Sequence, residues 1–317
     1  MRAVSLFSGI GGSSLGMVMA GYETTGYELN QWAVDRANEA GTATVLADLN
    51  NGVDFEADHV HSSAPCQAFS RCGHKADWHE DVANLTVRAA EIIMQTSPAT
   101  LSWENVTESV KSPQFKKAVK LLSRRYDLLS FNADASRCGC AQIRHRLWMI
   151  GVRRGRGTRE ALLALVPQIK ERMQNGSRTV LRDVIPELED RQVFLYPRHT
   201  RDPCLFPSSG CTPTIRRMAL AKPTPGIGPT EWSRGISDAD TVVFTPELLA
   251  RVSGFPDNHF TIRLRQQTRW ALGFGNCVPP PMQHYIMTLV AQVRELAGTG
   301  RGGSYTHGDF ALRRGRA

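Results

Sequence analysis

The sequence lacks any apolar run that approaches the roughly 20 residues needed to cross a bilayer. Its first residues, MRAVSLFSGIGG, hold one basic residue and only a short apolar stretch before a glycine cluster. A secretory signal has a longer apolar segment. We therefore expect a protein that stays in the cytoplasm and has no membrane partner.

The cysteines lack the spacing of a structural metal site. The chain has an odd number of them, seven, and no two form a C-x-x-C pair. This argues against a disulfide framework and a structural zinc site, and we expect no bound metal. Apart from Cys66, the cysteines are expected to be packing or surface residues: Cys72, Cys138, Cys140, Cys204, Cys211 and Cys277.

Acidic residues are too few to balance the basic ones. The chain has 38 Lys and Arg against 30 Asp and Glu, for a net charge of +8 and a pI near 9.3. Such a balance favours a polyanionic partner. The excess lies in the second half, over residues 151–182 and 191–235, where a solvated basic face would give the same pattern.

The first 150 residues alternate short β-rich runs with helical patterns. This alternation predicts an α/β fold, with a mostly parallel sheet and helices on both faces. We expect strands at residues 3–7, 24–29, 43–46, 58–63, 99–104, 128–133 and 147–152, and helices from 11, from 31 and at 82–95, 113–124 and 279–297.

The texture of the chain changes from about residue 175, where prolines and glycines replace periodic runs. We therefore expect a catalytic and cofactor-binding domain at 1–174 and a small, loop-rich domain at 175–265. Residues 266–298 would return to the first domain, and residues 299–317 would form a flexible basic tail.

A glycine-rich turn follows the first predicted strand. Gly9 and Gly11 would let the backbone approach a nucleotide-like cofactor at the carboxyl end of that strand. Glu28 ends the second strand, where an acidic side chain in such folds accepts hydrogen bonds from ribose hydroxyls, although a solvated surface glutamate is the alternative. Asp48 follows the third strand and could meet a purine amino group by the same argument.

Cys66 follows the fourth strand and would lie at the same edge of the sheet. Most cysteines are simply buried, but this position favours a nucleophile. Glu104 stands at the end of the next strand. In the segment QIRHR, Arg144 and Arg146 lie on one side of an extended chain, where both could reach an anion or a polar base edge.

Six segments, FSGIGG, PCQAFS, ENV, QIRHR, GFPD and GNCV, occur in the order and context of DNA (cytosine-5) methyltransferases. Along nearly its whole length the chain resembles that family, in its bacterial or phage form. The resemblance implies a Rossmann-like domain that depends on S-adenosyl-methionine, joined to a small target-recognition domain.

By this resemblance, Cys66 would attack carbon 6 of a cytosine flipped out of double-stranded DNA. Carbon 5 would then accept the methyl group of S-adenosyl-methionine, which leaves as S-adenosyl-homocysteine. Glu104 would hold ring nitrogen 3 and the amino group, while Arg144 and Arg146 would anchor the base and the cysteine loop. The cofactor would be surrounded by Phe7, Gly9, Gly11, Glu28, Leu29, Asp48 and Asn276, and the target base and DNA would be met by Pro65, Gln67, Ser70, Arg216 and Arg217.

Three alternatives stay open. The substrate could be RNA, since transfer-RNA cytosine methyltransferases share most of these segments. A modified cofactor could donate a group other than methyl, or the chain could bind DNA without catalysis. The segment between QIRHR and GFPD is short, so we expect a target site of about two to four base pairs. We also expect a monomer, whose size resembles that of restriction partners, solitary methylases and phage enzymes.

Overall fold

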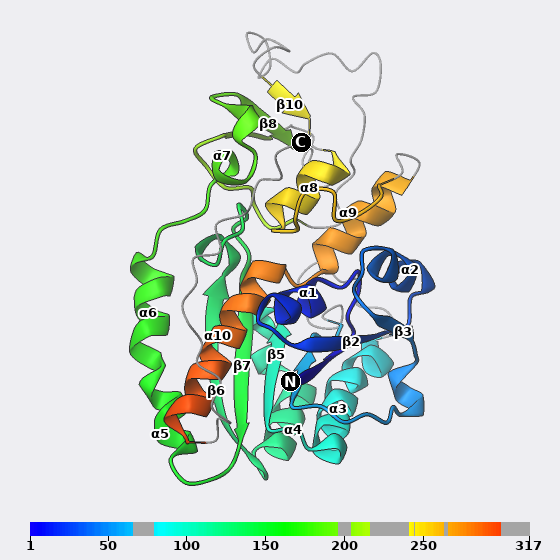
Figure 1. Ribbon diagram of the computed structural model, residues 1–317, viewed down its shortest axis with the longest axis vertical. Coiled ribbons are helices and arrows are strands. Elements are labelled where there is room, and N and C mark those ends of the chain that lie inside the picture. The colour runs from blue at the N-terminus through cyan, green and yellow to red at the C-terminus, as the bar shows by residue number, and fades with distance from the viewer. Residues whose placement is uncertain (66–78, 196–203, 216–240, 244, 263–265, 299–317) are drawn as a thin grey trace.

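The computed structural model describes residues 1–65, 79–195, 204–215, 241–243, 245–262 and 266–298. In this part of the chain the largest element is a seven-stranded sheet with the order β3-β2-β1-β4-β5-β7-β6 (Figure 1). Its strands are β1 (Arg2–Leu6), β2 (Glu23–Glu28), β3 (Thr44–Leu46), β4 (His59–Ser62), β5 (Thr100–Asn105), β6 (Tyr126–Asp134) and β7 (His145–Arg153).

Strands β1 to β5 run parallel, whereas β7 is antiparallel to both of its neighbours, β5 and β6. The predicted mostly parallel sheet is therefore confirmed. The directions also bring the amino end of β7 to the edge where the carboxyl ends of β4 and β5 lie.

Helices cover both faces of the sheet, as predicted. One face packs against α1 (Gly12–Met19), α5 (Thr158–Ala164) and α10 (Pro280–Leu296), and the other against α3 (His79–Thr96) and α4 (Pro113–Leu122) (Figure 1). Successive residues of a strand point to opposite faces. On β7, Trp148 and Ile150 accordingly pack with the first group of helices, and Leu147 and Met149 with the second.

Two predicted strands are longer in the structure than in the sequence pattern. The strand predicted at 128–133 is β6, and that at 147–152 is β7. The two pair with each other from Tyr126 opposite Arg153 to Asp134 opposite His145. Most of the added residues at the strand ends are polar or charged, so they do not extend the apolar pattern of the sequence. Apolar periodicity alone therefore underestimates the length of these two strands.

A smaller region lies above the carboxyl edge of the large sheet (Figure 1). Its sheet has the order β10-β8-β9, with β8 (Gln192–Leu195), β9 (Cys204–Pro207) and β10 (Thr241–Val243). The neighbouring helices are α2 (Gln31–Glu39), α7 (Leu181–Val184), α8 (Pro246–Val252) and α9 (Gln267–Asn276), whereas α6 (Val166–Asn175) packs with α5 and α10 on the large sheet.

The smaller region shares a hydrophobic cluster with the turn after β1, at the carboxyl edge of the large sheet. Leu181 of α7, Leu249 of α8 and Trp270 of α9 are buried together with Ile10, from the turn after β1. This shared cluster joins the region to the edge of the sheet, although the sequence of the region is rich in Pro and Gly. The predicted tail at 299–317 lies outside the described residues.

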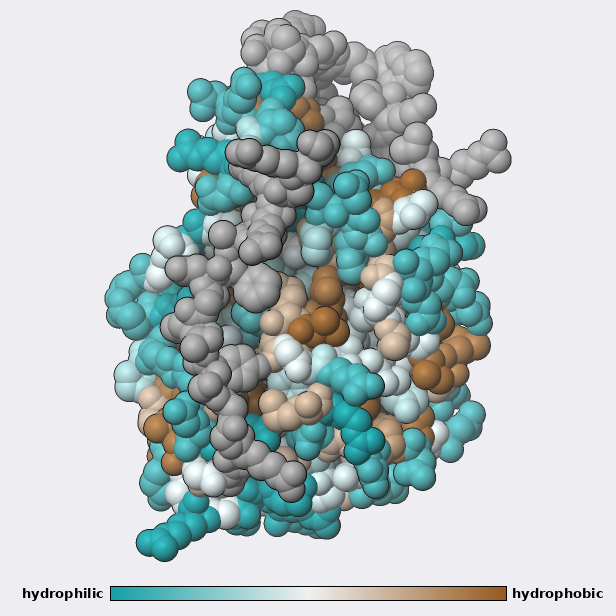
Figure 2. Space-filling model, in the orientation of Figure 1, coloured by the Kyte–Doolittle hydropathy of each residue, from teal (hydrophilic) through white to brown (hydrophobic). Residues whose placement is uncertain are grey.

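The surface seen in Figure 2 is mostly hydrophilic, with small, separated hydrophobic areas. Among the helices of the described residues, none is both long enough and apolar enough to cross a membrane.

A buried polar layer crosses the sheet beneath α10. His59 and His61 of β4 are fully buried, and Ser102 Oγ of β5 lies 2.9 Å from His59 Nε2 and 2.9 Å from His61 Nδ1. Gln283 Nε2 of α10 donates to the same oxygen at 3.3 Å. The hydroxyl has one proton, so it donates to one imidazole and accepts from the other. Burial lowers the pKa of His61 to about 3 and that of His59 well below its ordinary value.

We expect the free energy of unfolding to fall as the pH drops below about 6.5, the unfolded pKa of histidine. The folded pKa of each histidine is depressed, so the stability is complete above that pH and is lost toward the folded value, near 3 for His61. Each histidine contributes a slope of up to about 1.4 kcal/mol per pH unit. Urea unfolding from pH 7.5 to 5 measures it, and His61→Gln should reduce the slope. An unchanged slope in the variant would contradict this prediction.

Candidate active site

A pocket of about 660 Å³ lies at the edge of the sheet, beside the carboxyl ends of β1, β2, β4 and β5 and the amino end of β7. The end of α9 closes it on another side. The lining contains these residues that the sequence analysis singled out: Phe7, Gly9, Glu28, Leu29, Asp48, Pro65, Glu104, Arg144, Arg146 and Asn276. One cavity thus combines the predicted cofactor side and the predicted base side.

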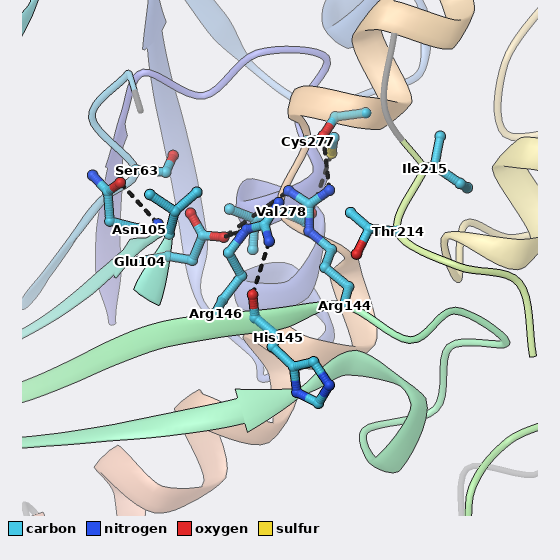
Figure 3. A network of polar contacts seen from close by, with 12 residues as sticks. Ser63, Glu104, Asn105, Arg144, His145, Arg146, Thr214, Ile215, Cys277 and Val278 are labelled. Carbon is cyan, nitrogen blue, oxygen red and sulfur yellow. Dashed lines mark hydrogen bonds and ion pairs between the residues drawn. The ribbon is translucent and has the colours of Figure 1, made fainter. Parts of the chain in front are cut away.

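A charged cluster forms the base side of this pocket (Figure 3). Glu104 lies near the end of β5 and is 7% exposed. Arg146 Nε lies 3.0 Å from Glu104 Oε1, and Arg144 Nη2 lies 4.0 Å from the same oxygen. Among the described residues, Oε1 has these ion pairs but no hydrogen-bond partner. The carboxylate is therefore held by charge in a nearly dry setting, where it can accept hydrogen bonds from a ligand.

Arg144 joins the two sides of the pocket. Arg144 is 2% exposed, and its Nη1 donates to the carbonyl of Gly275 at 2.7 Å. Gly275 precedes Asn276 in the chain. Its backbone N–H donates to Asp134 Oδ1 at 3.0 Å, which fixes the chain as it enters β7. Arg144 therefore connects Glu104 to the end of α9.

The cofactor side is built around the carboxylate of Glu28. Oε2 accepts the backbone N–H of Gly9 at 2.9 Å, and Oε1 accepts that of Asn30 at 2.9 Å. The side chain therefore ties the turn after β1 to the start of α2. Carboxylate oxygens have further lone pairs, so this group can also accept from a ligand's hydroxyls.

The turn after β1 is held in an unusual conformation. Phe7 has φ 60° and Gly9 has φ 56°, both in the left-handed region. Residues other than glycine rarely adopt this region, and such outliers often accompany functional sites. The carbonyl of Phe7 accepts a hydrogen bond from Ser63 Oγ at 3.2 Å, which links the turn to the segment after β4.

Gly11 lies behind the pocket rather than in its lining. It is the N-cap of α1 with φ 89°, and a Cβ there would come within 3.1 Å of Thr42. Its glycine serves the tight turn and this close approach. The sequence analysis expected Gly11 beside the cofactor; Gly11 is not among the residues that line the pocket, and its contact with a cofactor stays a prediction.

Asp48 and Leu29 lie at the ends of β3 and β2. Asp48 Oδ1 accepts the backbone N–H of Asn50 at 2.9 Å and so caps a short helical turn, Leu49–Asn51. Leu29 is 66% exposed, which is unusual for a large apolar side chain. An apolar ligand surface in the pocket would cover it.

The sequence analysis missed Trp32 and Gly273, which also line the pocket. Trp32 Nε1 donates to Gln266 Oε1 at 3.1 Å, and its ring meets Trp270 edge-on at 5.1 Å. A Cβ at Gly273 would lie 3.4 Å from the Trp32 ring. In the sequence, the position of Trp32 shortly after the second strand was the one hint that it lines the pocket. The residues that hold it there, Gln266 and Trp270, are far away along the chain.

Five residues predicted for the base and DNA side lie outside the described residues: Cys66, Gln67, Ser70, Arg216 and Arg217. Pro65, the residue before Cys66 in the sequence, lines the pocket. The chain leading to it is fixed, since Asn105 Nδ2 donates to the carbonyl of Ala64 at 3.2 Å.

Four cysteines whose side chains the structure describes are poor nucleophiles. Cys138, Cys140 and Cys277 are buried, and burial raises the pKa of Cys138 and Cys277 to about 12 and that of Cys140 well above its ordinary value. Cys211 is partly exposed, and burial raises the pKa of its thiol as well. These thiols stay protonated at neutral pH, so they suit packing rather than nucleophilic attack.

A family model described as C-5 cytosine-specific DNA methylase matches residues 1–203. The chain belongs to this family. The matched range contains the strand ends that form the pocket, from the glycine turn to QIRHR. The predicted resemblance to DNA (cytosine-5) methyltransferases is therefore confirmed.

Relatives of this methylase chain include bacterial and phage proteins. The type II methyltransferase M.HgiDI of Herpetosiphon aurantiacus is 31% identical over 304 residues, which cover 91% of this chain and 93% of that protein. The orphan methyltransferase M.SPRI of Bacillus phage SPR is 28% identical over 170 residues, 48% of this chain and 38% of that protein.

Among solved structures, the S. pombe Dnmt2 methyltransferase superposes with a TM-score of 0.66 at 15% identity, covering 92% of this chain and 98% of that one. This likeness concerns the fold alone. It agrees with the mixed sheet and its helices.

Proposed function

We propose that the protein transfers a methyl group from S-adenosyl-methionine to carbon 5 of a cytosine flipped out of double-stranded DNA. Family membership supports the reaction class, and one observation supports the roles of the residues. The Glu104 carboxylate, flanked by Arg144 and Arg146, lies in the same pocket as the cofactor side around Glu28.

The pocket fits such a cofactor. Its volume of about 660 Å³ lies within the range of roughly 300–1,000 Å³ that is usual for small-molecule sites. The Glu28 carboxylate would accept from the ribose, and Asp48 would face the purine. The turn of Phe7 and Gly9, with Leu29 and Asn276, would enclose the remainder, and Gly11 would shape the turn. When bound, S-adenosyl-methionine supplies an electrophilic methyl group.

The chain's own chemistry begins at Cys66, whose thiolate adds to carbon 6 of the cytosine and makes carbon 5 nucleophilic. Glu104 holds ring nitrogen 3 and the amino group, and Arg146, with Arg144, keeps this carboxylate in place and anchors the base. After alkylation of carbon 5, a base takes the proton from that carbon; the freed electron pair restores the 5,6 double bond, and the C6–S bond breaks to release the Cys66 thiolate. Pro65, Gln67 and Ser70 would contact the flipped base and the DNA around it.

The region at 175–265 would read the DNA, with Arg216 and Arg217 among the groups that contact it, and residues 1–174 and 266–298 would form the catalytic domain. A short segment of this kind suits a site of about two to four base pairs. A DNA substrate would place a monomeric enzyme at the nucleoid, in the cytoplasm of a bacterial or phage-infected cell.

DNA that carries 5-fluorocytosine tests this proposal. Fluorine at carbon 5 cannot leave as a proton does, so the protein should stay attached to the DNA through Cys66 in an adduct that survives denaturation. Formation of the adduct should require S-adenosyl-methionine, and a reaction without the cofactor is the control.

Mass spectrometry of nucleosides decides the substrate and the transferred group. Incubation with S-adenosyl-methionine should yield 5-methylcytosine in DNA and none in transfer RNA. Methylated RNA with unmodified DNA, or no adduct on the fluorinated duplex, would contradict the proposal.

A further inference from the structure

The segment from Thr212 to Ile215 runs beside the three residues that precede Arg144. The N–H of Thr212 donates to the carbonyl of Ala141 at 2.9 Å, and the N–H of Ile143 donates to the carbonyl of Thr212 at 2.8 Å. Gln142 and Thr212 form a parallel β-bridge. Backbone from a distant part of the chain thus holds the QIRHR segment immediately before its arginines.

Side chains strengthen this pairing. Thr214 Oγ1 donates to the carbonyl of Ile143 at 2.8 Å, and Gln142 Oε1 accepts the N–H of Ile215 at 3.0 Å. Gln142, Thr212 and Ile215 are buried. Figure 3 shows Thr214 and Ile215 beside Arg144. Residues 212–215, called the clamp below, therefore bond to each of residues 141–143 in turn.

The clamp is continuous with the small sheet. It follows β9 after a turn, and this turn is bonded to α7: the N–H of Leu181 donates to the carbonyl of Gly210 at 2.8 Å, and that of Arg182 to Ser208 at 2.9 Å. Between β9 and Ile215 hydrogen bonds hold the chain at Pro207, Ser208, Gly210, Cys211, Thr212, Thr214 and Ile215. A displacement of the small sheet would therefore be transmitted to residues 141–143.

On the other side, Arg144 leads directly into the pocket. It follows Ile143 in the chain, donates to the carbonyl of Gly275 and lies 4.0 Å from Glu104 Oε1. Residue 144 has little freedom, since Asp134 accepts its N–H and the clamp holds the residue before it. The clamp thus holds the backbone next to Arg144, from which the side chain extends toward Glu104.

We propose that the clamp is a positioning device that couples the small sheet to catalysis, with Thr214 as its positioning residue. This inference rests on the proposed roles of Glu104 and Arg144. Contact between the small region and DNA would, through the clamp, hold Arg144 where it keeps the Glu104 carboxylate correctly placed. Thr214 need not touch substrate or cofactor for this.

The test is Thr214→Val, which keeps the shape of the side chain and removes the hydroxyl. The single-turnover methylation rate should fall about tenfold, the effect of one hydrogen bond to a buried group, while the dissociation constants for S-adenosyl-methionine and DNA change less than about threefold. Thr214→Ser restores the hydroxyl and should recover the rate. The matched control is Thr288→Val on α10, where the hydroxyl donates to the carbonyl of Tyr285 at 2.7 Å and the rate should not change.

A second measurement does not depend on activity. Hydrogen exchange in Thr214→Val should be faster than in the wild type over residues 141–146 and unchanged in Thr288→Val. Absence of methylation by the wild type would defeat the proposed function, whereas the exchange result still decides the clamp. Unchanged exchange over 141–146, or equal rate losses in Thr214→Ser and Thr214→Val, would overturn the inference.

Discussion

Cys66→Ser is expected to abolish methyl transfer, with a loss on the order of a thousandfold or more, as for the removal of other enzymatic nucleophiles. A serine hydroxyl is a far weaker nucleophile than a thiolate at neutral pH. The side chains differ by one atom, so binding of DNA and S-adenosyl-methionine should change little. Methylation kinetics measure the loss of rate, and the dissociation constants for DNA and S-adenosyl-methionine show whether binding is kept.

The matched control is Cys211→Ser, which makes the same substitution at a partly exposed thiol. Cys211 Sγ donates to the carbonyl of Thr179 at 3.2 Å, and a serine hydroxyl can keep that bond. The control should retain the wild-type rate. Near-normal activity of Cys66→Ser would show that another group attacks the cytosine.

The positions of the two carboxylates in the pocket could be predicted because they depend on strand ends. Glu28 and Glu104 close apolar, β-branched or aromatic runs, and parallel strands bring their carboxyl ends to one edge. Both residues accordingly line the pocket. Predicting these two positions requires only the apolar pattern that marks each strand and the parallel direction of the strands.

The antiparallel direction of β7 could have been predicted from the loop that joins it to β6, but the sequence analysis did not make this prediction. A short loop with Gly139 joins Asp134 to His145, whereas parallel neighbours need a crossover of a dozen or more residues. The antiparallel direction decides the site, because it places Arg144 and Arg146 at the carboxyl edge of β5.

Contacts made by distant segments could not be predicted. Trp32 meets Gln266, just before α9, and Trp270 of α9, which lie far along the chain, and Arg144 donates to Gly275 of the same helix. These contacts depend on where α9 packs, and a sequence pattern with a period of 2 or 3.6 carries no information about that placement.

Glu104→Gln should lower the single-turnover rate by about 100-fold to 10,000-fold, the range of general acid–base effects, and change DNA affinity much less. Glutamine has nearly the same shape, so the base still fits, but one acceptor oxygen becomes an N–H donor and the negative charge is lost. Ring nitrogen 3 of cytosine gains negative charge during attack, and a protonated carboxyl can share a proton with it, whereas the glutamine amide cannot transfer one. Kinetics under single-turnover conditions, with the affinity measured separately, give the result.

The substitution also leaves two guanidinium groups, of Arg144 and Arg146, without their carboxylate. Loss of one partner from a buried ion pair is costly, so the unfolding free energy should be measured beside the rate. Glu187→Gln is the control, since Glu187 pairs with Arg251 and Arg251 lies in α8, outside the pocket lining. That variant should keep the wild-type rate. A loss below about tenfold in Glu104→Gln would mean that Glu104 acts mainly by holding the two arginines, and that the chemistry of the base depends on other groups.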